Sequence, residues 1–198
     1  MCILKECLQM KRVAILASGS GSNAENIIRY FENKPVCVFS LILSNKPDAY
    51  VHERAKGLAI PSFTVSRQGF ENGEALRLLK AHRIDFIVLA GFLLKIPENI
   101  LTEYPDKIIN IHPALLPKYG GRGMYGSHVH EAVTANKETE TGITIHYVNE
   151  NYDEGTIIFQ AKCQVLPTDS PEDVAEKVHA LEYEYFPKVI ESLLSNGL

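Results

Sequence analysis

Short apolar runs alternate with amphipathic segments over the first 111 residues of the chain. The first run, Val13–Ala17, has the length and the continuous hydrophobic character of a strand that is buried on both faces, and the later runs are also predicted to be strands. These runs are Val13–Ala17, Val36–Leu43, Pro61–Val65, Ile84–Ala90 and Lys107–Ile111. Between them, helices are predicted after the first strand (with Ile27, Ile28 and Phe31 on one side), at Asp48–Gly57, at Glu71–His82 and at Pro97–Tyr104. This alternation predicts an α/β fold with a doubly wound, mostly parallel sheet.

The pattern changes after residue 117. Lys118–Gly126 contains four glycines, so we expect a flexible loop there. A helix is predicted at Ser127–Ala135, with Ser127 as its N-cap. A last helix is predicted to begin with Ser170 as N-cap and Pro171 at its first position, and to run towards Leu194.

Two further strands are predicted in the last third of the chain. Thr141–Val148 alternates apolar and polar residues, as a half-buried strand does. Thr156–Val165 follows after a short polar loop, and the shortness of that loop predicts antiparallel pairing of the two strands. The parallel sheet is therefore expected to carry a C-terminal antiparallel extension.

Composition and charge narrow the possible classes of protein. The 198 residues are 45% apolar and 22% charged, and we expect a single domain over residues 10–198. Residues 1–9 lack the apolar core and cleavage site of a signal peptide, so we expect an N-terminal extension, disordered or not part of the natural chain. The net charge is −4 without a dense basic cluster, which argues against nucleic acid or an anionic membrane as partner. No apolar run reaches the ~20 residues of a membrane span, and a cytoplasmic protein fits.

Two polar side chains stand at the end of the fifth predicted strand. Asn110 and His112 are two residues apart, so on a strand they project from the same face. Pro113 restricts His112 to extended geometry and should end the strand there. Ligands bind at this edge of open α/β sheets. We favour a functional site over the alternative, in which the two side chains only cap a turn.

A glycine-rich loop, Ser18–Asn23, joins the first strand to the first helix. Its glycines and Ala24 match a loose dinucleotide fingerprint. The second strand, however, ends in Ser44–Pro47 without the acidic residue that would hold a ribose hydroxyl. A single phosphate, bound by backbone N–H groups and polar side chains of the loop, fits better. The alternative is a tight turn that needs glycine for its conformation alone.

Metal chemistry is not indicated. The four cysteines have no metal-like spacing, and Cys37 and Cys163 lie in apolar runs as buried thiols do. His128 and His130 are two residues apart with no third ligand evident, so we expect loop or substrate contacts. His146 alternates with apolar neighbours and is either a partner of the site or an ordinary strand histidine.

Several motifs together resemble the phosphoribosylglycinamide formyltransferase family, the folate-dependent enzymes of purine synthesis. They are Ser18–Asn23, Leu89–Phe92, Asn110–Tyr119 and Thr141–Gly155, and the likeness extends from about Met10 to near the end of the chain. The Asn-His-Pro segment is shared with other formyl-folate enzymes, such as methionyl-tRNA formyltransferase and formyltetrahydrofolate deformylase. The glycine loop sets the glycinamide enzyme apart from them.

The resemblance implies a Rossmann-like formyltransferase fold and a role for each matched position. The implied catalytic residues are Asn110, His112 and Asp153. The implied ribonucleotide-binding residues are Gly21, Ser22 and Asn23, which hold the phosphate, and Glu182. The implied folate-binding residues are Leu93, Leu94, Lys95, Ile96 and Asn110. The folate-contacting arginine of the family has no clear counterpart, and Arg67 is a candidate.

The implied reaction moves the formyl group of 10-formyltetrahydrofolate, a co-substrate, to the amine of glycinamide ribonucleotide, without a metal. Attack by an amine creates a tetrahedral oxyanion, which needs hydrogen-bond donors. Asn110 and a protonated His112 can donate, and Asp153 favours the imidazolium and can pass protons. The partners are these small molecules, with the protein a monomer or homodimer. Alternatives are another formyl-folate enzyme, or a non-catalytic nucleotide-binding module.

Overall fold

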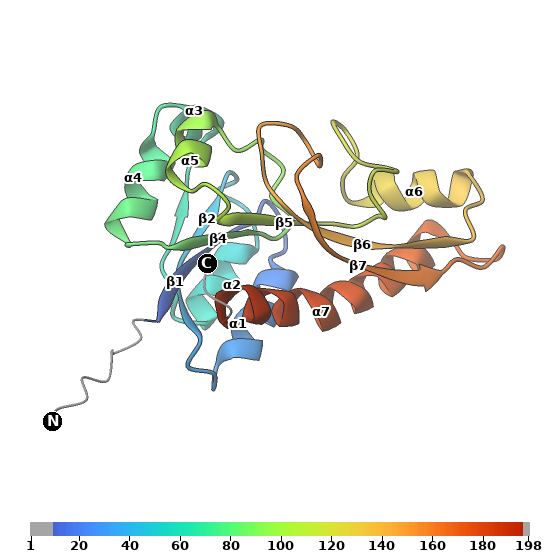
Figure 1. Ribbon diagram of the computed structural model, residues 1–198, viewed down its shortest axis with the longest axis horizontal. Helices are drawn as coiled ribbons and strands as arrows, with labels where there is room; N and C mark the ends of the chain where they lie inside the picture. The colour runs from blue at the N-terminus through green and yellow to red at the C-terminus, as the bar shows by residue number, and fades with distance from the viewer. Residues whose placement is uncertain (1–9, 196–198) are drawn as a thin grey trace, which may run out of the picture.

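The computed structural model describes residues 10–195, and seven strands there form one sheet in the order β3-β2-β1-β4-β5-β6-β7 (Figure 1). The strands are β1 Lys11–Leu16, β2 Cys37–Ser44, β3 Ser62–Thr64, β4 Phe86–Leu89, β5 Ile108–His112, β6 Glu140–Tyr147 and β7 Ile157–Gln164. The first five pair in parallel, whereas β6 is antiparallel to both β5 and β7. This confirms the predicted sheet with its antiparallel extension. Residues 1–9, where an extension is predicted, lie outside the described residues.

Helices cover both faces of the sheet. They are α1 Ser22–Phe31, α2 Val51–Gly57, α3 Arg67–Glu71, α4 Glu74–Ala81, α5 Glu98–Glu103, α6 Ser127–Ala135 and α7 Pro171–Ser195. Val13 and Ile15 of β1 pack in a core with α1, α2 and α7. Ala14 and Leu16 pack on the other face with α3, α4 and α5. Alternate residues of β1 thus serve two cores, which explains its uninterrupted apolar sequence.

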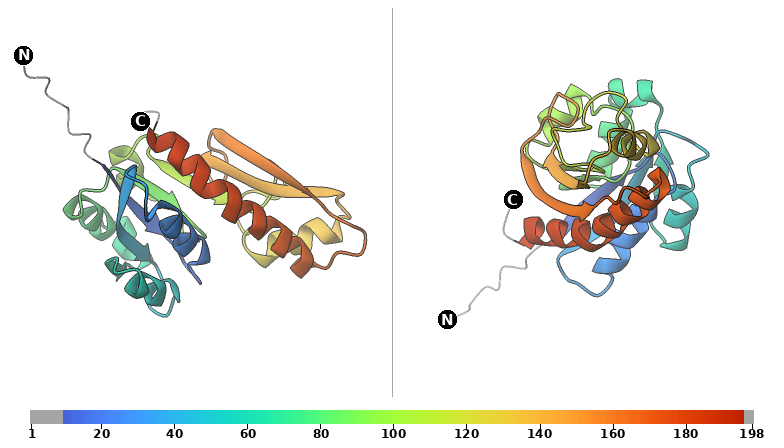
Figure 2. Two further views of the ribbon diagram at one scale, coloured as in Figure 1. Left: turned by 90° about the horizontal axis from the view of Figure 1, so that it is seen from below. Right: turned by 90° about the vertical axis from the view of Figure 1, so that its right-hand side faces the viewer.

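The long C-terminal helix α7 lies along the sheet and packs against α1, α6, β6 and β7 (Figure 2). Ser170 caps it, because the Asp173 N–H donates to the Ser170 Oγ at 3.1 Å, and Pro171 is its first residue. Both confirm the prediction for this helix. Among the helices of residues 10–195, none combines the length and the apolar character that a membrane crossing requires.

Two helix predictions are wrong in detail. The helix predicted from Glu71 to His82 begins only at Glu74, as α4, because Gly73 before it has a left-handed backbone with φ 86°, and a separate short helix that was not predicted, α3, precedes it. Ser127, predicted as the N-cap of α6, is the first residue of that helix instead. Gly126 takes the N-cap position, and it has no side chain to make a capping bond.

β6 is more buried than its alternating sequence predicts. Thr144 and His146 lie on its polar side, yet they are only 0% and 2% exposed. The segment 113–117 that follows β5 folds over this side, and the Leu116 N–H donates to the Thr144 hydroxyl at 3.0 Å. The prediction of a half-buried strand is therefore wrong, because the polar face of β6 lies under the turn that leaves the fifth strand.

Candidate active site

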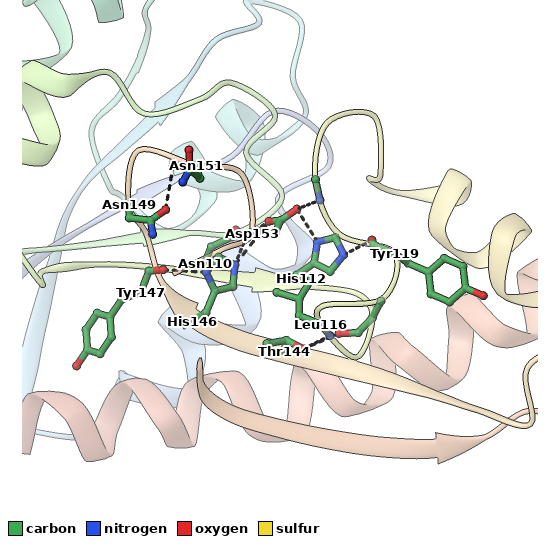
Figure 3. A network of polar contacts seen from close by, with 12 residues as sticks. Asn110, His112, Leu116, Tyr119, Thr144, His146, Tyr147, Asn149, Asn151 and Asp153 are labelled. Atoms are coloured by element: carbon green, nitrogen blue, oxygen red, sulfur yellow. Dashed lines mark hydrogen bonds and ion pairs between the residues drawn. The ribbon is translucent and has the colours of Figure 1, made fainter. Parts of the chain in front are cut away.

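Asn110, His112 and Asp153 meet at the C-terminal end of β5 (Figure 3). β5 ends at His112, as the following Pro113 predicts, and places Asn110 and His112 on the same side. Asp153 enters from the loop between β6 and β7, with φ 56°. Its Oδ1 lies 3.5 Å from Asn110 Nδ2, and its Oδ2 lies 3.5 Å from His112 Nδ1. The structure thus brings together the three residues that the sequence predicts to act as one set.

His146 completes this cluster from β6, where it stands opposite Asn110 in the strand register. Its Nδ1 lies 2.8 Å from the Tyr147 carbonyl, which can only accept, so Nδ1 carries the proton. Its Nε2 lies 3.1 Å from Asn110 Nδ2 and 3.6 Å from Asp153 Oδ1. His146 is therefore a partner of the site that orients the Asn110 amide, rather than an ordinary strand histidine.

Burial and charge have opposite effects on the pKa values of His112 and Asp153. Burial lowers the pKa of His112 below its ordinary value, and the Asp153 carboxylate and the Tyr119 carbonyl offset this only in part. Burial would raise the pKa of Asp153, but contacts with His146, His112 and the Gly121 N–H together hold that pKa below its ordinary value. The expectation that Asp153 makes His112 a cation therefore has the right sign, but burial outweighs it.

The glycine loop joins β1 to α1 and packs against α2. Gly21 has a left-handed backbone with φ 72°, and a Cβ there would lie 2.4 Å from Val51 Cγ2. The Arg54 Nε–H donates to the Ser20 carbonyl at 2.8 Å and so fixes the loop from the same helix. Ser22 and Asn23, in the first turn of α1, line a cavity of about 840 Å³. The N-terminus of a helix offers backbone N–H groups that bind anions in many proteins.

A polar wall faces this cavity beside His112. Glu182, which is 5% exposed, accepts at Oε2 from Asn23 Nδ2 at 2.8 Å and lies 3.0 Å from His179 Nδ1. The hydrogen bond to Glu182 raises the pKa of His179. Asn23 Oδ1 and His130 Nδ1 are buried and have no hydrogen-bond partner among the described residues. Buried polar atoms of this kind can bind a ligand's hydroxyl or phosphate groups.

The predictions for His128, His130, Cys37 and Cys163 have different outcomes. His130 lines the cavity, whereas His128 Nδ1 lies 3.3 Å from the Gly123 carbonyl within the loop. Cys37 is buried as predicted, but Cys163 is only half-buried because it lies on the edge strand β7. Within residues 10–195, no group of three or more His, Cys, Asp or Glu side chains is placed to hold a metal ion.

Two adjoining cavities contain all the predicted site residues. A cavity of about 840 Å³ is lined by Gly21, Ser22, Asn23, Leu93, Leu94, Asn110, His112, Asp153 and Glu182. A second cavity of about 750 Å³ is lined by Leu94, Lys95 and Ile96. Arg67, Leu94 and Tyr152 border both cavities. The predicted phosphate loop, the first half of the predicted folate segment and the Asn110, His112 and Asp153 cluster therefore line one cavity, and the second half of the folate segment lines the adjoining one.

The sequence as a whole matches a known protein family. The family model described as formyl transferase matches residues 11–190. The chain belongs to the formyl transferase family. The match covers all seven strands, so this formyl transferase fold includes every element that builds the two cavities.

Curated relatives of this formyl transferase support the resemblance seen in the sequence. The chain is 38% identical over 191 residues to the phosphoribosylglycinamide formyltransferase of Bacillus subtilis, covering 93% of the chain and 95% of that protein. It is 35% identical over 190 residues to the chloroplastic phosphoribosylglycinamide formyltransferase of Arabidopsis thaliana, covering 92% of the chain. It spans 65% of that relative's length, and 14% of a trifunctional purine biosynthetic protein of Drosophila pseudoobscura pseudoobscura.

Solved structures agree on the fold of this formyl transferase. The phosphoribosylglycinamide formyltransferase of Bacillus halodurans superposes with a TM-score of 0.86 at 36% identity, covering 95% of this chain and 97% of that one. The enzyme of that name from Anaplasma phagocytophilum has a TM-score of 0.87 at 34% identity, covering 94% and 88% of the two chains. These similarities confirm both the family resemblance and the predicted fold.

Three residues of the site escape the sequence prediction. His179 lies one helical turn before Glu182, and this i, i+3 spacing could have signalled a pair. Tyr152 borders both cavities. The Ser18 Oγ donates to Asn45 Oδ1 at 2.5 Å and accepts the Leu93 N–H at 2.8 Å, which joins the glycine loop to the predicted folate segment. The last two roles depend on loops that only the fold brings together.

Proposed function

We propose that this formyl transferase moves the formyl group of 10-formyltetrahydrofolate to the amine of glycinamide ribonucleotide. One observation carries the proposal. Asn110, His112 and Asp153 form a single cluster in one cavity with a helix-start phosphate loop. A non-catalytic nucleotide-binding module would use the loop, but it would have no need for the cluster. The named relatives and solved structures support the choice of substrate.

The two substrates are proposed to meet at the cluster, one bound in the first cavity and the other where the two cavities join. The phosphate binds at Gly21, Ser22 and Asn23, where the first turn of α1 lines the cavity and offers its backbone N–H groups. Glu182, with its neighbours Asn23 and His179, binds the sugar and glycinamide parts through the polar wall. This arrangement directs the amine of the ribonucleotide towards the end of β5.

The folate is proposed to occupy the space where the two cavities join. Leu93, Leu94 and Ile96 offer apolar contacts, and Asn110 lies at the inner end. Arg67 and Lys95 line the outer cavity and can pair with the carboxylates of a folate. Because Arg67 borders both cavities, it is our candidate for the folate-contacting arginine of the family. In this binding mode the formyl group is expected to lie beside His112.

The residues of the cluster divide the chemistry between them. The Asn110 amide donates one N–H to His146, and its longer 3.5 Å contact to Asp153 can give way to the developing oxyanion. His112 stabilises the same charge once it is protonated. Asp153, ionised at neutral pH because its pKa is lowered, accepts a proton from the attacking amine, which is then delivered to the leaving nitrogen. No covalent enzyme intermediate is needed.

This proposal carries secondary predictions. We expect a cytoplasmic protein, acting as a monomer or homodimer on small-molecule substrates. We also expect residues 10–198 to fold as one domain.

A turnover assay tests the proposal directly. The purified chain should form tetrahydrofolate from 10-formyltetrahydrofolate only when glycinamide ribonucleotide is present, without ATP and in excess chelator. His112→Asn should lose this turnover and still bind the ribonucleotide, because the phosphate loop is intact. Turnover that requires ATP or a metal would contradict the proposal. So would formate release at an equal rate without the ribonucleotide, which is the behaviour of a deformylase.

A further inference from the structure

A short turn after β5 contacts both members of the catalytic pair. The Tyr119 carbonyl accepts the Nε2–H of His112 at 2.7 Å, and the Gly121 N–H donates to Asp153 Oδ2 at 2.9 Å. Residues 119–121, here called the 119–121 turn, thus form one hydrogen bond with the imidazole of His112 and one with the carboxylate of Asp153. Because the carbonyl can only accept, it keeps the proton on Nε2 and leaves Nδ1 facing Asp153.

The backbone of this turn is in a conformation that a tyrosine rarely adopts. Tyr119 has φ 56°, in the left-handed region, where a Cβ crowds the following carbonyl. The turn is also closely packed, since a Cβ on Gly120 would lie 2.5 Å from Leu116 Cδ2 and 3.4 Å from Asp153 Cβ. Something must therefore hold Tyr119 in place against its own backbone preference.

The side chain of Tyr119 supplies such an anchor. Its hydroxyl donates to Glu138 Oε1 at 2.9 Å and lies 3.1 Å from the Asn136 Nδ2 that donates to it. Lys118 Nζ lies 2.9 Å from the same Glu138 oxygen. We call Lys118, Tyr119, Asn136 and Glu138 the tyrosine clasp.

Asn136 and Glu138 of the clasp belong to the segment between α6 and β6, whose backbone is held by hydrogen bonds. The Glu138 N–H donates to the Val133 carbonyl of α6 at 3.2 Å. One residue on, the Thr139 carbonyl accepts the Val165 N–H at 2.9 Å. Glu138 and Asn136 are therefore held independently of the turn that they anchor.

We propose that Tyr119 is a positioning residue, whose clasped side chain keeps the 119–121 turn in the left-handed geometry that orients His112 and Asp153. The effect on turnover rests on the proposed function. The effect on the geometry of His112 does not, because the clasp and the turn exist without substrate.

The first test breaks the clasp without touching the active site. Tyr119→Phe and Glu138→Ala should each lower kcat about 10- to 100-fold, because a small misplacement of catalytic groups has effects of that order. KM should change little. Glu140→Ala is the control, since Glu140 makes a comparable surface pair with Lys162 at 2.7 Å. Equal kcat values for all three variants and the parent protein would overturn the proposal.

The second test isolates the backbone. Tyr119→Gly and Tyr119→Ala both lose the clasp, but glycine adopts the left-handed conformation freely. The glycine variant should therefore retain at least about fivefold more activity than the alanine variant. Arg83, which has φ 53° and lies outside the cavities, provides the control pair Arg83→Gly and Arg83→Ala, with no difference in kcat expected. An alanine variant at 119 as active as the glycine variant would count against the proposal.

The third test does not depend on turnover at all. Nitrogen NMR of the histidine-labelled protein reports which His112 nitrogen carries the proton, with His112→Asn identifying its signals among the seven histidines. The parent should show the Nε2–H form, and Tyr119→Phe a mixture of forms. The Tyr119 carbonyl also raises the pKa of His112, so breaking the clasp should move that titration to lower pH.

The titration must be interpreted with the other groups that face His112. These are Asp153, His146, His130 and Glu182. They are unchanged in the clasp variants, so a shift would arise from the turn. An unaltered His112 proton position and titration would overturn the positioning role, even if formyl transfer itself is confirmed. Altered His112 signals in a protein without this turnover would reject only the proposed function.

Discussion

His112 and Asp153 depend on each other for their charge states. The Asp153 carboxylate opposes the burial that lowers the pKa of His112, and His112 helps to keep the pKa of Asp153 low. Their atoms lie 3.5 Å apart with little exposure, so water screens the interaction weakly. At the scale of single residues, the site is therefore a coupled pair rather than two separate groups.

This coupling predicts non-additive effects of substitution. His112→Asn and Asp153→Asn should each lower kcat by at least about 10²–10⁴-fold, the range of general acid–base catalysis. The double variant should be scarcely slower than the slower single variant, because either change disables the same unit. Steady-state kinetics of the three variants measures this. Losses that multiply would mean that the two residues act independently.

The same pair predicts a direction for the pH dependence. Asp153 raises the pKa of His112, so Asp153→Asn should lower that pKa further. A rate that needs protonated His112 falls as the pH rises through its pKa. The falling limb of the pH–rate profile should therefore move to lower pH in Asp153→Asn. A limb that stays in place would show that Asp153 does not set the charge of His112.

At the scale of elements, the glycine loop shows where sequence reasoning needed the fold. Gly21 belongs to the predicted phosphate site, but a side chain there would meet Val51 of α2, so a substitution would disturb the packing of the loop. Gly19 is the better probe, because a Cβ there has no atom within 4 Å and the residue lines the cavity.

Gly19→Val should weaken binding of glycinamide ribonucleotide while folate binding and stability change little. Titration calorimetry with each substrate measures the two affinities. Gly57→Val is the matched control, since a Cβ at Gly57 also meets nothing within 4 Å and lies outside both cavities. Equal weakening of both substrates by Gly19→Val would place the phosphate elsewhere.

The buried strands were the most predictable elements. Runs such as Val13–Ala17 face two cores, so their hydrophobicity alone identifies them. The break at Gly73 and the burial of Thr144 were not predictable, because each is set by tertiary contacts or a left-handed backbone. Local patterns thus indicate which segments form the sheet, but not how turns fold back over it.

At the scale of the whole molecule, the site is assembled from distant parts of the chain. Asn110 and His112 could be paired from the sequence, since strand geometry places them on one face. Asp153 and Glu182 were assigned through the family resemblance, as no local rule connects residues so far apart. The hydrogen bonds of Tyr119 and Ser18 had no sequence signal, because they arise only when the loops meet.

The fate of the formyl carbon shows directly whether this protein transfers the formyl group to glycinamide ribonucleotide. A single turnover with 10-formyltetrahydrofolate labelled with ¹³C in the formyl group, in the presence of glycinamide ribonucleotide, can be followed by carbon NMR. We predict that the label appears in the new amide of the ribonucleotide, and that Asn110→Ala slows its appearance. Label that accumulates as free formate, with the ribonucleotide unmodified, would contradict the account.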